Sequence, residues 1–163
     1  MTLTFNDPSE QQRWYAVDDG VMGGQSRSQF SVVDGEGRFH GEVSLDNGGG
    51  FASVRREPHD FESTLADARG IALAVRGDGR TYQLRLKSTS LGDASAYRVK
   101  FTPATDSWET LHFSWAAFAA VRRGTLLTDA PSIKPADITQ VGFLIADRTD
   151  GPFCLRVKYI ESL

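Results

Sequence analysis

The sequence has few of the features that would assign a protein to a particular class. Cys154 is the only cysteine in 163 residues, which excludes an internal disulfide and a cysteine-based zinc site. No stretch approaches 18 apolar residues, so no transmembrane helix is predicted. The segment Met1–Asp7 lacks the basic and apolar regions of a signal peptide. We therefore expect a cytoplasmic protein with no membrane span.

Catalytic and cofactor signatures are also missing. The sequence contains no G-x-S-x-G, P-loop or H-E-x-x-H pattern, and Gly77 and Gly79 do not continue into a dinucleotide-binding motif. His40, His59 and His112 lie far apart in the sequence, which argues against a metal site, and His40 and His112 have the polar parity of surface residues. We expect no cofactor, no metal and no catalytic residues, with an enzyme as the third alternative after two kinds of binding protein.

The net charge is −3 and the isoelectric point is near 5.6, so no overall positive field attracts nucleic acid. Apolar residues make up 40% and charged residues 24%, the balance of a soluble globular protein. The length suits one domain, and we expect residues 1–163 to form it.

Alternation of apolar and polar residues dominates the chain and predicts half-buried strands. It is clearest in Tyr82–Lys87, Tyr97–Phe101 and Phe153–Tyr159. Ile71–Val75 and Val141–Ala146 are apolar on both parities, as in central strands covered on both faces. Helical stretches are short. The pattern predicts an all-β fold, an antiparallel β-sandwich or jelly roll.

The alternating positions also predict the core, and the glycines between them predict one hairpin. The Gly77–Gly79 segment lies between two strand patterns and is interpreted as a hairpin turn. The predicted core consists of Phe39, Val43, Leu73, Val75, Leu84, Val99, Phe101, Leu111, Phe113, Phe143, Ile145, Leu155 and Val157.

Two irregular segments, Trp14–Ser26 and Leu45–Arg56, carry the candidate binding residues. The first holds Asp18, Asp19 and Met22 among several glycines, and the second holds Asn47, three consecutive glycines and Arg55. Each segment can be a structural loop or a binding loop. We expect the Asp18–Ser26 loop and the Gly48–Arg55 segment to lie against each other, with Arg55 pairing with one of the two aspartates.

A locally basic sheet face is the third candidate site. Arg85 and Lys87 share the outward parity of one predicted strand, and Arg98 and Lys100 share that of the next. Neighbouring strands would bring the four cations together, and Arg156 and Lys158 would extend the face if the last strand lay nearby. A solvated surface is one interpretation, and a docking surface for an acidic protein segment or another polyanion is the other.

Several motifs give the chain a family resemblance. D-G-V-M-G-G-Q-S at Asp19–Ser26 and G-G-F-A-S-V-R at Gly49–Arg55 are the most specific, and further matches lie in Leu73–Tyr82 and Gly151–Leu155. From Phe5 to Ile160 the sequence resembles the complex I intermediate-associated protein 30 (CIA30) family. The resemblance implies a galactose-binding domain-like jelly roll, a fold shared with many carbohydrate-binding modules.

The resemblance also implies a class of function. Mitochondrial members of the family are assembly factors for NADH:ubiquinone oxidoreductase, so the leading hypothesis is a chaperone-like, protein-binding domain. Its partner would be another protein, such as respiratory-complex subunits or assembly intermediates. The alternative is a carbohydrate or small-ligand binding module, and the exposure of aromatic rings on a sheet face would favour it.

Overall fold

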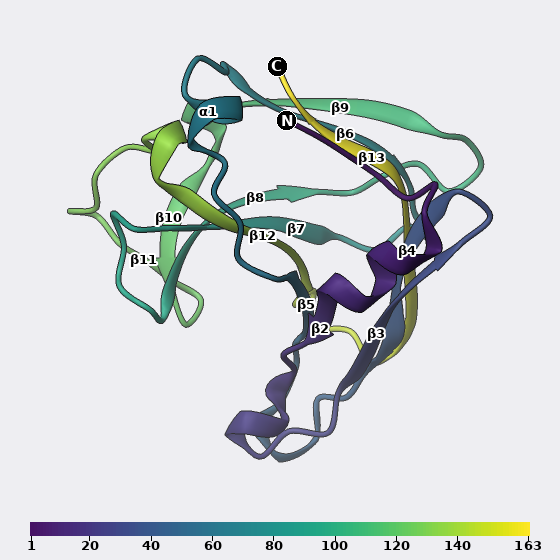
Figure 1. Cartoon of the computed structure of the whole chain (residues 1–163). Helices are drawn as coiled ribbons and strands as arrows, with labels where there is room; N and C mark the ends of the chain where they lie inside the picture. Colours follow the sequence, from purple (N-terminus) through teal and green to yellow (C-terminus); the bar gives the residue numbers. More distant parts are fainter.

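The computed structural model describes the backbone of residues 1–163 and every side chain except those of Val21, Met22 and Glu62. Two antiparallel sheets pack against each other and enclose the core (Figure 1). This confirms the predicted all-β antiparallel sandwich. Among the described residues, no helix is both long enough and apolar enough to cross a bilayer.

The first sheet has six strands in the described backbone, in the order β3-β4-β13-β6-β9, with β1 added along β13. Its strands are β1 (Thr2–Thr4), β3 (Arg27–Val33), β4 (Glu36–Val43), β6 (Gly70–Arg76), β9 (Glu109–Ser114) and β13 (Gly151–Ser162). The strand interpreted as central from its apolar sequence, β6, lies between β13 and β9 as expected.

The second sheet has seven strands in the described backbone, in the order β11-β10-β8-β7-β12-β5-β2. They are β2 (Trp14–Ala16), β5 (Ala52–Arg56), β7 (Tyr82–Ser88), β8 (Ser95–Phe101), β10 (Ala119–Arg122), β11 (Thr125–Leu126) and β12 (Ile138–Ile145). The other apolar strand, β12, is interior in this sheet.

Helical structure is limited to short turns. The α-helix α1 covers Glu62–Leu65, and short 3₁₀ helices cover Pro8–Arg13, Asp19–Met22, Asp46–Gly48, Trp115–Ala117 and Pro135–Asp137. None of them organises the sandwich, as the sequence predicts.

The core lies between the two sheets. Of the predicted core residues, the structure buries Phe39, Val43, Leu73, Val75, Leu84, Val99, Phe101, Phe143, Ile145, Leu155 and Val157. Trp14 of the second sheet connects the layers, because its ring stacks on Phe30 of the first sheet with centroids 4.0 Å apart and also faces Phe143. Aromatic stacking thus joins the sheets near β2 and β3.

Two predictions need correction. Leu111 and Phe113 are only partly buried, because β9 is an edge strand with no neighbouring strand on one side. Gly77–Gly79 is not a hairpin turn, since the strands on either side of it, β6 and β7, belong to different sheets. The segment carries the chain from one layer of the sandwich to the other, and sequence alternation cannot distinguish the two connections.

The two chain ends lie side by side at one edge of the first sheet (Figure 1). The amino group of Met1 donates to Ser162 Oγ over 2.9 Å, and Thr2 pairs with Glu161.

Candidate functional site

Asp19 joins the two irregular segments singled out in the sequence. Its carboxylate accepts hydrogen bonds from the N–H and hydroxyl of Ser26 at 2.8 and 2.6 Å, and from the N–H groups of Gly50 and Phe51 at 2.7 and 3.2 Å. Burial alone would raise the pKa of Asp19, but these hydrogen bonds together lower it. Asp19 is therefore a buried carboxylate ion held by neutral donors.

Asp18 makes a second, parallel connection. Its carboxylate accepts from the N–H of Ser28 at 3.0 Å, from the Ser28 hydroxyl, and from the N–H of Ser53 at 3.0 Å. We call Asp18 and Asp19 with these donors the aspartate clasp. The clasp ties the loop after β2 to the starts of β3 and β5, so the two segments lie against each other as predicted.

Close approach to the clasp explains two of the motif glycines. A Cβ atom on Gly24 would lie 2.4 Å from Asp19 Cγ, and one on Gly49 would lie 2.6 Å from Asp19 Oδ2. Neither position has room for a side chain. The motif residues around Asp19 and Gly49 thus have a structural task, which is to satisfy the buried carboxylate of Asp19 and the half-buried carboxylate of Asp18 with backbone donors.

The predicted ion pair between Arg55 and an aspartate does not form. Both carboxylates are satisfied by backbone N–H groups and serine hydroxyls, and Arg55 points to the outer face of the second sheet instead. Asn47 is exposed at a turn with φ of 56° and donates no described hydrogen bond to either aspartate. Met22 lies outside the described side chains. The clasp is therefore a structural element in which these three residues take no described part.

The basic residues do gather on one face. β7 and β8 are neighbours, with Arg85 opposite Arg98 and Gln83 opposite Lys100. Arg55 of β5 and Arg85 of β7 both pair with Gly142 of the strand between them, β12. We call Arg55, Arg85, Lys87, Arg98 and Lys100 the cationic face.

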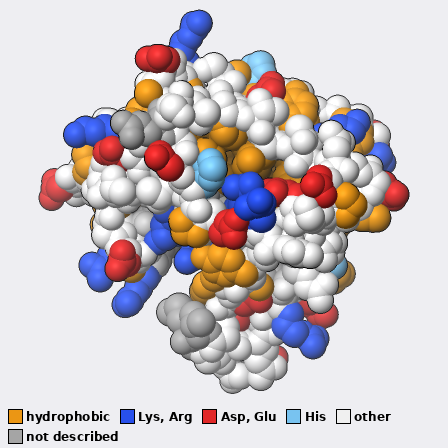
Figure 2. Space-filling view, viewed as in Figure 1, with side chains coloured by type: hydrophobic (Ala, Val, Ile, Leu, Met, Phe, Trp, Pro, Cys, Tyr) orange, Lys and Arg blue, Asp and Glu red, His pale blue; other side chains and the backbone are white. Residues whose placement is uncertain are grey.

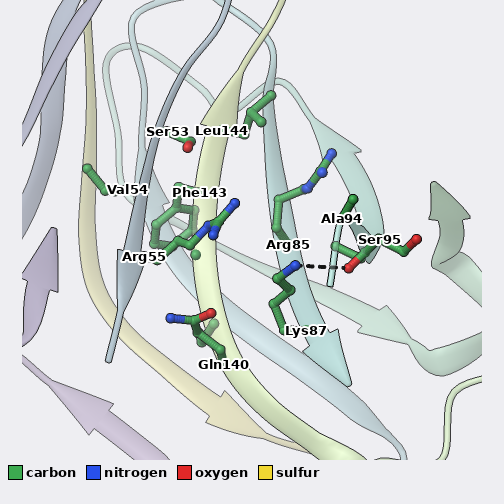
Figure 3. Close-up of a pocket in the computed structure, with 13 residues that line it drawn as sticks. Ser53, Val54, Arg55, Arg85, Lys87, Ala94, Ser95, Gln140, Phe143 and Leu144 are labelled. Carbon is green, nitrogen blue, oxygen red and sulfur yellow. Dashed lines mark hydrogen bonds between the residues drawn. The ribbon is translucent and has the colours of Figure 1, made fainter. Parts of the chain in front are cut away.

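A recess of about 60 Å³ lies within the cationic face (Figure 3). Figure 3 shows Arg55 reaching across β12 toward the strand that carries Arg85 and Lys87, with Lys87 pointing toward Ser95. The amide of Gln140 closes one side, and it donates to Tyr15 Oη and to the carbonyl of Arg56 at 2.8 Å each. Among the described residues that line the recess there is no carboxylate, imidazole or thiol.

The charges in the recess repel one another. Burial, and then the charges of Arg98 and Arg55, lowers the pKa of Arg85 to about 10. Burial, and then Arg55 and Arg85, lowers the pKa of Lys87, against the opposite effect of Asp93. A lowered pKa means that the folded protein destabilises the charged forms of Arg85 and Lys87. A bound anion would stabilise these charged forms.

Positive charge also gathers on one part of the molecular surface (Figure 2). Figure 2 shows several Lys and Arg side chains at the lower left, on the side where Figure 1 labels β10 and β11. The chain as a whole is acidic, with a net charge of −3, so this positive surface is local.

Arg156 and Lys158 do not extend the cationic face. They lie on β13 of the other sheet, where both stand over the ring of Trp108, at 5.3 and 4.6 Å from its centroid. Arg156 also pairs with Glu36, with Nε 2.9 Å from the carboxylate. The order of the strands, which alternation does not reveal, separates these two cations from the others.

Three residues in or beside the recess carry little signal in the sequence: Gln140 and Gly142, which line it, and Tyr15, which accepts a hydrogen bond from Gln140. Tyr15 and Gln140 were not singled out, because a tyrosine in an irregular segment and a glutamine next to an apolar strand carry no distinctive signal. Gly142 had a weak one, since it interrupts an otherwise apolar strand. Arg55 belongs to the cationic face because β5 lies next to β12. These strands are far apart in the sequence, so the sequence pattern does not predict their pairing.

Comparison with known proteins adds a family match. A family model described as complex I intermediate-associated protein 30 (CIA30) matches residues 3–157. The mitochondrial protein named complex I intermediate-associated protein 30 of Drosophila melanogaster is 25% identical over 98% of this chain, and that of Mus musculus is 22% identical over 96%. This chain spans only 61% and 53% of the lengths of these two relatives.

The predicted cytoplasmic location is contradicted by these names. Several curated relatives, including one from Caenorhabditis elegans, are named as mitochondrial proteins or as probable members of that group. The absence of a basic or apolar stretch at the start of the sequence was therefore an insufficient basis for assigning a compartment.

Solved structures agree with the fold. A family 11 carbohydrate-binding module from Clostridium thermocellum, determined with a mixed-linked tetrasaccharide, superposes with a TM-score of 0.66 over 98% of this chain and 95% of that one, at 14% identity. The agarase AgWH50C superposes with a TM-score of 0.64 over 99% of this chain and 26% of that one, at 10% identity. At these identities the likeness shows a shared carbohydrate-module-like sandwich, in agreement with the predicted galactose-binding-like fold, and shows nothing of the ligand.

Proposed function

Because the chain belongs to the complex I intermediate-associated protein 30 family, we propose that it is a non-catalytic, protein-binding domain that acts in assembly, with residues 1–163 as the folded unit. The name of the relatives associates them with an intermediate of complex I. Subunits and assembly intermediates of that complex are accordingly the first partners to test.

The observation that carries the proposal is the cationic face on an acidic chain. Arg85 faces Arg98 directly across two strands, and like charges in that position destabilise a sheet. A partner surface that supplies negative charge would remove this repulsion, and complementary charge also directs association. The chemistry of the recess supports a binding role, since its charged groups have one sign and offer no pair of acid and base.

A sugar-binding module remains the second candidate, and Tyr15 favours it. Tyr15 is 45% exposed and lies opposite Arg55 on the second sheet, where a sugar ring could stack on its phenol ring. A neutral glycan would leave the charges of the cationic face without counterions, so a protein partner accounts for more of this surface.

Copurification tests the proposal. The tagged chain is captured from its native cells with the proteins bound to it, and the affinity of each captured protein is then measured for the parent and for the Arg85→Glu/Arg98→Glu variant. We expect the double reversal to weaken binding at least about tenfold, and added salt to weaken binding to the parent.

Two controls make the result decisive. Circular dichroism and the denaturation midpoint should show that the double variant keeps the fold. Binding that neither salt nor the reversal affects would exclude this face, and a glycan captured in place of proteins would support the sugar-binding alternative.

A further inference from the structure

The cationic face contains a row of arginines that runs across the strands. Arg55 and Arg85 lie on either side of Gly142, and Arg98 lies next to Arg85. Neighbouring strands are about 4.8 Å apart, so the row from Arg55 to Arg98 spans roughly 14 Å at the backbone. Lys100 lies two residues beyond Arg98 on the same face of β8.

Some arginines of the chain pair with a carboxylate, whereas the three arginines of the row pair with none among the described residues. Arg56 pairs with Glu10 and Arg80 pairs with Asp147, at 2.6 and 2.7 Å. In the row, by contrast, Arg85 donates to the neutral side chain of Gln83. The described residues supply neither a hydrogen bond nor an ion pair to the side chains of Arg55 and Arg98.

Lys87 is held in the same way, by oxygen atoms without a full charge. Its ammonium group donates to the backbone carbonyls of Asp93 and Ser95. The Asp93 carboxylate acts on Lys87 from the loop before β8, but it does not line the recess. The negative charge that would neutralise the recess must therefore come from another molecule.

Gly142 shapes the recess. A Cβ atom there would lie 2.6 Å from the carbonyl oxygen of Val54 and 3.4 Å from Arg55 Cγ. Without that atom, Arg55 lies across β12 toward Arg85 and Lys87 (Figure 3). The resulting volume of about 60 Å³ is far below the roughly 300–1,000 Å³ of pockets that enclose a small molecule. It suits a group of a few atoms, such as a carboxylate.

We propose that the recess anchors one carboxylate of an extended acidic segment of a partner protein, and that further carboxylates of the segment lie along Arg98 and Lys100. This rests on the proposed protein-binding function and names the chemistry of the partner. Side chains on one side of an extended segment repeat about every 6.8 Å, so three acidic residues at alternate positions span roughly 14 Å. That length matches the arginine row, and guanidinium groups bind carboxylates through paired hydrogen bonds.

A designed peptide tests the proposal without knowledge of the partner. The probe is a synthetic peptide in which Glu alternates with Ser, and its control carries Gln in place of Glu. We expect the acidic peptide to bind the purified chain in titration calorimetry and the Gln peptide not to bind. Arg55→Gln/Arg85→Gln should weaken the acidic peptide at least about tenfold, since removing one charge-assisted hydrogen bond weakens binding by about that factor.

The matched control is Arg27→Gln/Arg122→Gln. Both of these arginines are exposed and lie outside the recess, on β3 and β10, so the net charge changes equally. We expect the control to change affinity less than about twofold. Equal losses in the two variants, or equal binding of the Gln peptide, would overturn the proposal. The denaturation midpoint of the recess variant should stay at or above that of the parent, because the substitutions remove repulsion.

Two further binding measurements, one with inorganic phosphate and one with a captured protein partner, distinguish a failure of the carboxylate anchor from a failure of the proposed function. If inorganic phosphate binds and the Glu peptide does not, the recess is an anion site of another kind and the acidic segment is excluded. If a captured protein partner ignores Arg55→Gln/Arg85→Gln, the protein-binding function stands and this anchor is wrong. If the Glu peptide binds through Arg55 and Arg85 but no protein is captured, the anchor stands and the assembly function fails.

Discussion

The Asp19 side chain shows what a single residue does in this fold. Asp19 is 1% exposed, and its carboxylate faces N–H and O–H donors from Ser26, Gly50 and Phe51. Asp19→Asn would turn an NH₂ group toward some of these donors and leave them without an acceptor. We expect a loss of roughly 2–3 kcal/mol in the free energy of unfolding, measured by urea denaturation. Asp106→Asn, at an exposed loop position, removes the same charge and should change stability by less than about 0.5 kcal/mol.

The same carboxylate sets the expected pH dependence. Hydrogen bonds outweigh burial and lower the pKa of Asp19 below its ordinary value of 3.8. A group with a lowered folded-state pKa stabilises the fold above its unfolded-state pKa, and this contribution is lost as pH falls through the folded-state value. The stability difference between the parent and Asp19→Asn should thus be constant from neutral pH down to about 5, and should shrink below 3.8. A difference that persists at the lowest pH would contradict this assignment.

At the scale of the strand, position in the sheet decides how much a buried ring contributes. Phe143 on the interior strand β12 is fully buried, whereas Phe113 on the edge strand β9 is partly buried. We expect Phe143→Ala to lower the free energy of unfolding by about 3–5 kcal/mol and Phe113→Ala by roughly 1–2 kcal/mol. Thermal and urea denaturation of both variants check this, and equal losses would show that β9 is covered as well as β12.

Sequence periodicity predicted several of the longer strands but not which strands are neighbours. Alternation and apolar runs identify β6, β7, β8, β12 and β13, because burial on one face or on both leaves a direct pattern in the residues. The change of sheet after β6 leaves no such pattern, and the Gly77–Gly79 turn was misinterpreted for that reason. Which strand pairs with which depends on packing across the whole sandwich.

The candidate site shows the same division. Lys87 and Arg98 could be placed on one face because their strands follow each other in the sequence. Arg55 was assigned to the aspartates instead, since opposite charges attract and its position beside β12 was not visible. The actual partners of the aspartates are largely backbone N–H groups. Every residue type except proline carries one, so the sequence does not show which residues will donate to a carboxylate.

At the scale of the whole molecule, the C-terminal strand β13 is an interior strand of the first sheet. β13 lies between β4 and β6 and contributes Leu155, Val157 and Ile160, all fully buried. We expect deletion of residues 151–163 to abolish cooperative unfolding, because β4 and β6 each lose one of their two neighbouring strands and the first sheet is split in two. Deletion of Met1–Thr4, which removes only the peripheral strand β1, should leave a cooperative transition at a lower midpoint. A cooperative transition in the chain without β13, followed by circular dichroism, would show that the second sheet is stable alone.

Because the two chain ends lie next to each other, the domain can be attached to a longer chain from one side only. A segment attached before Met1 and one attached after Leu163 would both leave from the same edge of the first sheet. The cationic face belongs to the other sheet. The domain can therefore be held in place by either end, or inserted into a longer chain through both, while Arg55, Arg85 and Arg98 stay open to an incoming partner.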